Sequence, residues 1–215
     1  MHICESIIAS TAHGQEILVA GTVAAAGATA VGLYKLDYER IPRAAVLSSA
    51  FFVVSLIHVP LGPIAVHLML SGLMGLLLGW SVFPALLIAL LLQSLFLPSF
   101  AGLTALGLNT VVMGLPGLAC YYLFRCPVRS DSGTIATATG FAAGATGILL
   151  AGVLGATVLL GAGEAFAEIG FGFLLANLPL AVIEGAVTAN VVVLLRKVRP
   201  ELLEAPLLLP AGGKN

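Results

Sequence analysis

Long apolar runs recur along the whole chain, and they limit the folds open to it more than any other feature. The chain has 215 residues, of which 60% are hydrophobic and 9% charged, and its mean hydropathy is +1.11. Soluble domains carry about a quarter charged residues, and a bilayer-spanning helix needs about 20 mostly apolar residues. The runs are continuous rather than alternating, which argues against a transmembrane β-barrel. The pattern therefore predicts an all-α, polytopic membrane protein.

The breaks between the apolar runs predict seven transmembrane helices. The third and fourth are separated only by Gly79–Ser81 and should form a tight helical hairpin, with one bent element as the alternative. Outside the bundle, which spans 17–199, we expect an external N-terminal loop over 1–16 and a cytoplasmic tail over 200–215. The expected helices cover residues 17–34, 44–59, 65–80, 82–98, 107–124, 135–163 and 171–195.

The basic residues predict the orientation of this bundle. With the N-terminus outside, every Lys and Arg falls on the cytoplasmic side, whereas the external segments carry glutamates, as the positive-inside rule requires. No basic patch suggests nucleic-acid binding. Residues 1–16 contain no Lys or Arg before the first apolar run, so they do not resemble a cleavable signal peptide, and we expect the N-terminus to be retained. The basic residues are Lys35, Arg40, Arg43, Arg125, Arg129, Arg196, Lys197, Arg199 and Lys214.

Small residues repeat at helical spacing in the sixth expected span. Small side chains let helices approach closely within lipid, so most of these residues should serve packing inside the bundle. The repeated positions are Gly144, Gly147, Gly152 and Gly155.

The first two residues, Met1 and His2, together offer three nitrogen donors to a metal ion. The terminal amine, the amide nitrogen of His2 and its imidazole can form fused chelate rings. One more nitrogen would complete a planar set, which suits Ni(II) and Cu(II) and is accessible to Co(II), but suits Zn(II) poorly. Many chains begin with Met-His by chance, so the signal depends on its combination with an external N-terminus. His13, His58 and His67 also fall near the external face, and the residues alone leave the fourth donor open among them.

Four further polar residues are candidates to orient the metal ligands, because a ligating histidine usually donates its second ring N–H to a carboxylate, carbonyl or water. These candidates are Glu5, His13, Gln93 and Asn109. For Gln93 and Asn109, helix capping is the alternative.

Glu184 lies near the middle of the last expected span, where an ionisable side chain is costly and a functional role is the default hypothesis. Counting along the helix places it far from an external metal site. We expect a structural polar contact, with Asn177, Thr188 or another helix, rather than a ligand role.

Three stretches and the N-terminal MHI resemble one known family. The stretches are VHLMLSGLMGLLLG (66–79), LLQSLFLPSFAGLTALGLNTVVMG (91–114) and LPLAVIEGAVTA (178–189). Together they resemble the cobalt/nickel substrate-binding S components of energy-coupling factor (ECF) transporters, the CbiM/NikM family, from Met1 to Leu195. The chain departs from the family pattern after MHI, where Cys4–Ile7 lacks the usual glycine and aromatic residue, and at Phe100–Gly102, which keeps one glycine of the usual pair.

The resemblance implies a six-helix S-component core with one extra N-terminal helix. It implies metal ligation by the Met1 amine, by the amide and imidazole of His2, and by His67 as the fourth donor. The cargo would be Ni²⁺ or Co²⁺, captured outside a bacterial or archaeal cytoplasmic membrane, with no resident cofactor. The role of Cys4 stays open, although a thiolate would compete with a planar nitrogen set.

The resemblance also implies partners. An S component works with a transmembrane coupling (T) subunit and two ATP-binding cassette ATPases, and it leaves open whether a small accessory membrane subunit is required. The chain itself contains no P-loop motif, so it would be a transport subunit and not an enzyme.

Two other functions remain open at this point. An S component for an organic micronutrient would need a pocket lined by aromatic residues, yet the external loops are poor in Trp and Tyr. An intramembrane enzyme would need a nucleophile–base pair or an HExxH motif, and neither pattern occurs.

Metal binding should weaken as the pH falls, because capture displaces protons from the terminal amine and the amide. The reference pKa of a terminal amine is about 7.7–8.0, so its deprotonated, metal-binding fraction falls steadily from about pH 8 to about pH 5.5. Affinity measured across this range tests the chelate, and a constant affinity would contradict it.

Overall fold

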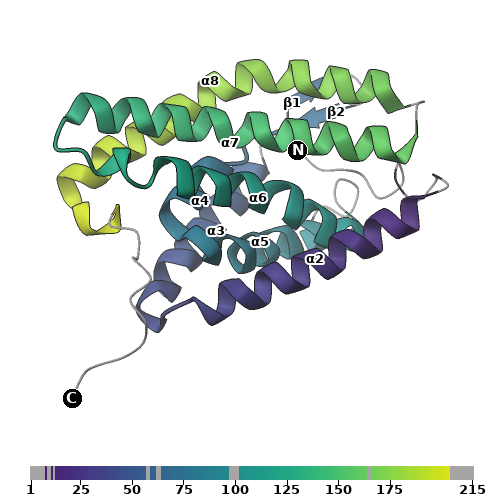
Figure 1. Ribbon diagram of the computed structural model, residues 1–215, viewed down its shortest axis with the longest axis horizontal. Helices are drawn as coiled ribbons and strands as arrows, with labels where there is room; N and C mark the ends of the chain where they lie inside the picture. The colour runs from purple at the N-terminus through teal and green to yellow at the C-terminus, as the bar shows by residue number, and fades with distance from the viewer. Residues whose placement is uncertain are drawn as a thin grey trace.

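Helix-forming apolar runs, separated by glycine, proline and charged breakers, build a bundle of α-helices with one short β-hairpin in the computed structural model (Figure 1). The structure describes residues 8, 11, 13–56, 59–61, 64–96, 102–163 and 166–203. Among the described residues, five helical stretches are long and apolar enough to cross a membrane by length and composition, and one of them, Ser71–Phe96, contains both α4 and α5. This confirms the polytopic class, while the count of seven spans stays a prediction. Within the described residues the α-helices are α2 (Gly14–Tyr34), α3 (Ile41–Ser55), α4 (Ser71–Leu78), α5 (Val82–Phe96), α6 (Leu106–Phe124), α7 (Gly133–Ala162) and α8 (Ala167–Val198).

Residues 65–70, expected to open the third span, are not helical, and this part of the prediction is wrong. Strand β1 (Val59–Leu61) pairs antiparallel with β2 (Ile64–Val66), and residues 67–70 have no regular structure before α4 begins. A short apolar run fits a strand as well as a helix. The glycine and prolines of the VPLGP stretch favour a chain reversal at this point.

Helix α4 runs parallel to α6. Gly75 lies against the backbone of Gly117, and four residues further on Gly79 lies against the ring of Tyr121. Gly79 has a φ of 57° and a ψ of −126°, which ends α4 and starts the short 3-10 helix η2 (Gly79–Ser81). A positive φ is readily adopted by glycine alone, so this residue permits the break.

Helix α5 runs back in the opposite direction. Val82 contacts Gly117 and Phe83 contacts Gly114, so increasing residue number in α5 matches decreasing number in α6. Since α4 is parallel to α6 and α5 is antiparallel to it, the two form the hairpin that the sequence predicted.

Glycines hold α7 close to its two main neighbours. Gly144 lies against the backbone of Glu184 in α8, and Gly152 lies against the side chain of Asn177. Gly147 faces α4 instead, where it lies against the backbone at Gly72. These positions confirm that the glycine repeat of the sixth span serves packing inside the bundle.

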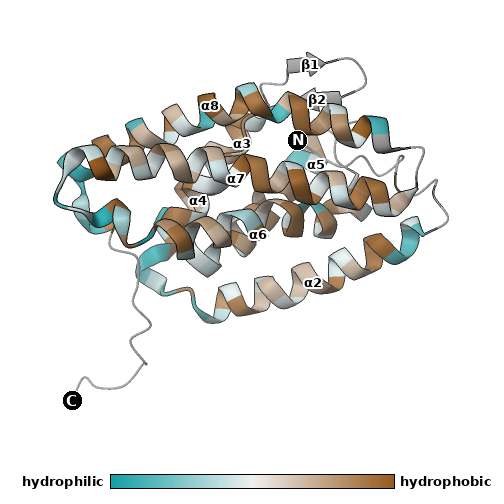
Figure 2. Ribbon diagram, turned by 45° about the horizontal axis from the view of Figure 1, so that its top comes forward, coloured by the Kyte–Doolittle hydropathy of each residue, from teal (hydrophilic) through white to brown (hydrophobic). Residues whose placement is uncertain are grey.

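The described basic residues gather at one end of the bundle, where α7 meets the C-terminal end of α8. The hydropathy colouring is hydrophilic there and also at the start of α2, at the opposite end (Figure 2). The Lys35 Nζ lies 4.8 Å from the centre of the Trp80 ring, and Arg129 Nε donates a hydrogen bond of 3.2 Å to the Leu203 carbonyl. The clustering agrees with the sorting of charges along the chain, while the side of the membrane that this end faces stays a prediction.

Replacing Gly75 with alanine should destabilise the bundle, because the added Cβ would lie 1.9 Å from the carbonyl oxygen of Gly117 and neither backbone can yield locally. Overpacking of this kind costs about 1–3 kcal/mol. The melting temperature of the purified protein in detergent measures the effect. Gly27→Ala is the matched control, since its Cβ would meet nothing within 4 Å, and an equal drop in both variants would contradict the packing argument.

Candidate metal centre

His67 directly follows β2 and is buried in the bundle, with 2% of its surface exposed. Its Nδ1 lies 2.8 Å from the Leu68 carbonyl oxygen. Because a carbonyl oxygen only accepts, this bond puts the ring proton on Nδ1 and leaves the lone pair on Nε2, which is the tautomer a metal ligand needs. The ring of Phe51 in α3 meets the imidazole edge to face, with centroids 6.3 Å apart and an interplanar angle of 85°. Two neighbours therefore fix the orientation of the imidazole.

The segment that carries His67 into the core is non-helical and buried. Met69 has no exposed surface, and Leu70 is 6% exposed. Leu70 adopts the left-handed conformation, with φ 48° and ψ 19°, which costs a residue other than glycine about 1–3 kcal/mol and persists only where its surroundings enforce it. The Leu70 carbonyl accepts the first helical bond of α4, from Met74 N–H at 2.8 Å.

Glu184, in the middle of α8, supplies the acceptor for this segment. One oxygen of its fully buried carboxylate, Oε1, accepts hydrogen bonds from the backbone N–H groups of Met69 and Leu70, the latter at 3.0 Å. The expectation that Glu184 lies far from His67 is wrong, because α4 starts deep in the bundle and the non-helical segment brings His67 within two residues of this contact. The expected polar contact is present, but its partner is the backbone before α4. The side-chain polar atoms of Asn177 and Thr188 have no hydrogen-bond partner among the described residues.

Gln93 in α5 and Asn109 in α6 are both buried, with 0% and 2% of their surfaces exposed. Within the described part of the chain, neither amide atom of Gln93 has a hydrogen-bond partner, so the capping alternative does not account for it. A buried primary amide without partners is uncommon, which keeps Gln93 a candidate for orienting a ligand.

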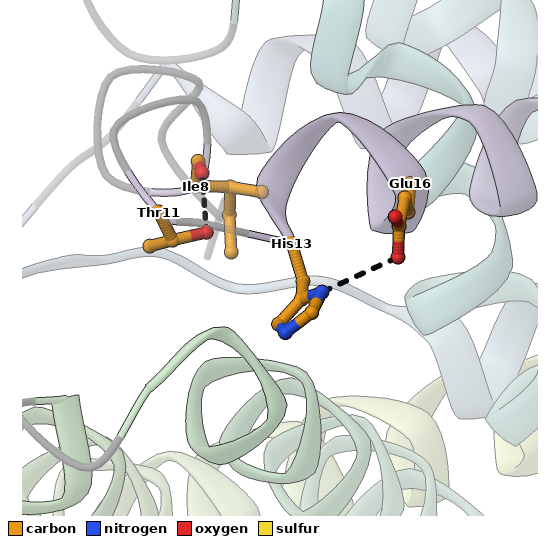
Figure 3. A network of polar contacts seen from close by, with 4 residues as sticks. All are labelled: Ile8, Thr11, His13 and Glu16. Atoms are coloured by element: carbon orange, nitrogen blue, oxygen red, sulfur yellow. Dashed lines mark hydrogen bonds and ion pairs between the residues drawn. The ribbon is translucent and has the colours of Figure 1, made fainter.

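His13 lies at the surface instead, at the start of α2 (Figure 3). Its Nδ1 is 3.3 Å from Glu16 Oε2, and the two side chains are 68% and 80% exposed. Beside this pair, the Thr11 hydroxyl donates to the Ile8 carbonyl at 2.8 Å. In this position the His13 imidazole pairs with Glu16 at the surface, outside the buried surroundings of His67.

Before α2, the side chain of Ile8 is fully buried in the bundle. Ile8 packs in an apolar cluster formed by the first residues of α2, the start of α6 and the end of α7. Its buried members are Leu18, Ala105, Leu108, Val112, Leu159 and Ala162. Ile8 is therefore fixed at the bundle end opposite the basic cluster.

Met1, His2, Cys4, Glu5 and His58 lie outside the described residues. Among the residues that are described, no group of three or more His, Cys, Asp or Glu side chains could hold a metal ion. A metal bound at His67 would need donors from beyond that part of the chain.

Two features of this region have no clear signature in the sequence, and a third has a partial one. Phe51 is one apolar residue among many, and nothing marks it as the neighbour of His67. The left-handed Leu70 has no glycine or asparagine to announce it. The contact of Glu184 with Met69 could have been anticipated in part, since a carboxylate in mid-span must find donors.

A scan against protein-family models matches residues 2–202 to CbiM, described as the cobalt uptake substrate-specific transmembrane region. The chain is 40% identical over 205 residues to a Haemophilus influenzae protein named for metal transport, covering 94% of this chain and 97% of that protein. It is 33% identical over 228 residues to the cobalt transport protein CbiM of Geobacter sulfurreducens, covering 99% of this chain but 64% of that longer protein.

Two solved structures share the fold. The crystal structure of a transition metal transporter aligns with a TM-score of 0.71 over 92% of this chain and 93% of that chain, at 21% identity. A truncated transition metal transporter aligns with a TM-score of 0.66 over 92% of this chain and 99% of that chain, at 19% identity. With a family model that covers nearly the whole chain and relatives that agree with it, this protein belongs to the CbiM family of transmembrane components for cobalt uptake.

Proposed function

We propose that this protein is the substrate-binding membrane subunit of an ATP-driven ECF-type importer, and that it captures Ni²⁺ or Co²⁺ on the external side of the membrane. The ligands are the terminal amine of Met1, the amide nitrogen and imidazole of His2, and the imidazole of His67. Four nitrogens in a plane suit Ni(II) and remain accessible to Co(II).

The state of His67 is the observation that carries this proposal. An imidazole that is 2% exposed, with Nδ1 bonded to the Leu68 carbonyl, presents Nε2 as a donor in a protected site. A bond from the second ring nitrogen to a carbonyl is the usual arrangement around a metal-bound histidine. His13, by contrast, is exposed and paired with Glu16.

The burial of Ile8 supports the participation of the chain start. Ile8 is fixed against α2, α6 and α7, and an extended chain advances by at most about 3.6 Å per residue. The donors at Met1 and His2 can therefore lie no further than roughly 25 Å from Ile8.

Transport needs partners in this proposal, because the chain contains no P-loop of its own. A transmembrane coupling subunit and two ATP-binding cassette ATPases would supply the energy, with or without a small accessory membrane subunit. Membership of a metal-uptake family favours this reading over an organic micronutrient carrier and over an intramembrane enzyme.

Blocking the terminal amine should abolish tight metal binding, because a chain lengthened at its N-terminus loses both the amine donor and its chelate ring. The experiment compares metal content and Ni²⁺ affinity of protein with a native Met1 start and protein with an uncleaved N-terminal extension free of His and Cys. Equal metal in the two preparations would rule out the amine as a ligand.

Replacing His67 with alanine should remove one of the four ligands. The affinity should fall by more than the 10–100-fold that loss of an outer-shell partner typically costs. Isothermal titration with Ni²⁺ or Co²⁺ measures it on purified protein. His13→Ala is the control, because His13 is exposed and should leave affinity unchanged. A His67→Ala variant that binds like wild type would remove His67 from the site.

A further inference from the structure

The chain between β2 and α4 presents a problem that the helices around it do not share. Residues 67–70 are non-helical and mostly buried among helices. Inside a membrane bundle, every backbone N–H and C=O must find a partner within the protein. A helix that begins at such a depth also leaves the N–H groups of its first turn without intrahelical acceptors.

Glu184 meets this need from another helix. Its Oε1 accepts from both Met69 N–H and Leu70 N–H, so a single atom fixes two consecutive peptide groups. Hydrogen bonds from N–H groups to a carboxylate are stronger than those to neutral acceptors. The bonds fall at Leu70, the left-handed residue whose conformation needs enforcement. The second oxygen, Oε2, has no partner within the described residues, so these two peptide groups are the described donors that the carboxylate meets.

The position of this contact connects it to His67. His67 and Met69 are separated by Leu68 alone, and the Leu68 carbonyl accepts the His67 Nδ1 proton. The Glu184 carboxylate thus holds the peptide group between Leu68 and Met69 through its N–H. The carbonyl of the same peptide group accepts the hydrogen bond from the His67 imidazole. A shift of the Met69 or Leu70 peptide would move the Leu68 carbonyl and turn the ring with it.

We propose that Glu184 is a positioning residue for the metal site, which fixes the 67–70 segment so that His67 Nε2 points at the metal. The inference rests on the proposed function, since it assumes that His67 is a metal ligand. Glu184 itself does not bind the metal. Its role is that of an acceptor for backbone N–H groups, so an amide oxygen at the same place should replace most of it.

The test uses the full chain with a native N-terminus, purified in detergent and titrated with Ni²⁺ alone. Glu184→Met keeps the length of the side chain and removes the acceptor, whereas Glu184→Gln keeps an acceptor oxygen. Thr188→Val is the matched control, one turn further along α8, because Thr188 is equally buried and its hydroxyl has no partner among the described residues.

Glu184→Met should weaken Ni²⁺ binding by about 10–100-fold, as loss of outer-shell support does elsewhere. Glu184→Gln should retain most of the affinity, and Thr188→Val should match wild type. The absorption band of Ni²⁺ bound to Glu184→Met should shift toward that of His67→Ala. If Glu184→Met does not fold, Glu184→Asp takes its place, because it withdraws the acceptor by one methylene.

A double-mutant cycle separates positioning from general stability. If Glu184 acts through His67, removing it in a His67→Ala background should cost little further affinity. If the losses of affinity in the two single variants add to within about twofold in the double variant, the two effects are independent and the proposal is overturned. Equal losses in Glu184→Gln and Glu184→Met, or wild-type affinity in Glu184→Met, would also overturn it. Wild-type protein that binds no Ni²⁺ or Co²⁺, or His67→Ala that binds normally, would instead refute the proposed function.

Discussion

The structure depends on one constraint: inside a bilayer, each backbone polar group must be bonded within the protein. Regular helices meet it by themselves, which is why the long apolar runs of this chain are almost entirely helical. Within the described residues, the stretch from β2 to α4 departs from this pattern, because there the chain enters the core without helical bonds. A carboxylate on α8 bonds its N–H groups there, and the only described buried histidine lies two residues from that contact. The departure from helical geometry therefore coincides with the candidate site.

Close packing around α7 makes this departure possible. Gly144 lets the backbone of Glu184 approach α7, and Gly147 lets the start of α4 approach α7 near Gly72. Through these two glycines, the carboxylate of one neighbour meets the peptide groups of the other beside a common helix. A side chain at either glycine would separate α8 or α4 from α7, so small residues here determine the site geometry as well as the stability of the bundle.

The sequence predicts those parts of this fold that follow from periodicity and charge. Continuous apolar runs locate the helices, Gly79–Ser81 locates the hairpin, and the glycines of the sixth span indicate close packing. Only the first part of the predicted helix 65–80 is wrong, because a short apolar run carries no signal that separates a strand or an irregular segment from a helix. Glu184 was placed far from His67 because counting along α8 assumes that His67 stays at the membrane surface. The non-helical segment removes that assumption, and its left-handed Leu70 depends on tertiary contacts that no local pattern encodes.

On the proposed site, donor chemistry and geometry contribute differently to metal choice. Nitrogen donors bind Ni²⁺ more tightly than Co²⁺, and Cu²⁺ more tightly than either, so the proposed chelate of Met1 and His2 taken alone would follow that order. The imidazole of His67 is the one proposed donor with a fixed orientation among the described residues, set by the Leu68 carbonyl and by Phe51. These two contacts then decide whether His67 Nε2 lies in the plane of the other three proposed nitrogens. On this proposal, selectivity among these metal ions beyond their intrinsic order comes from the residues that fix the orientation of His67, and Glu184 is one of them.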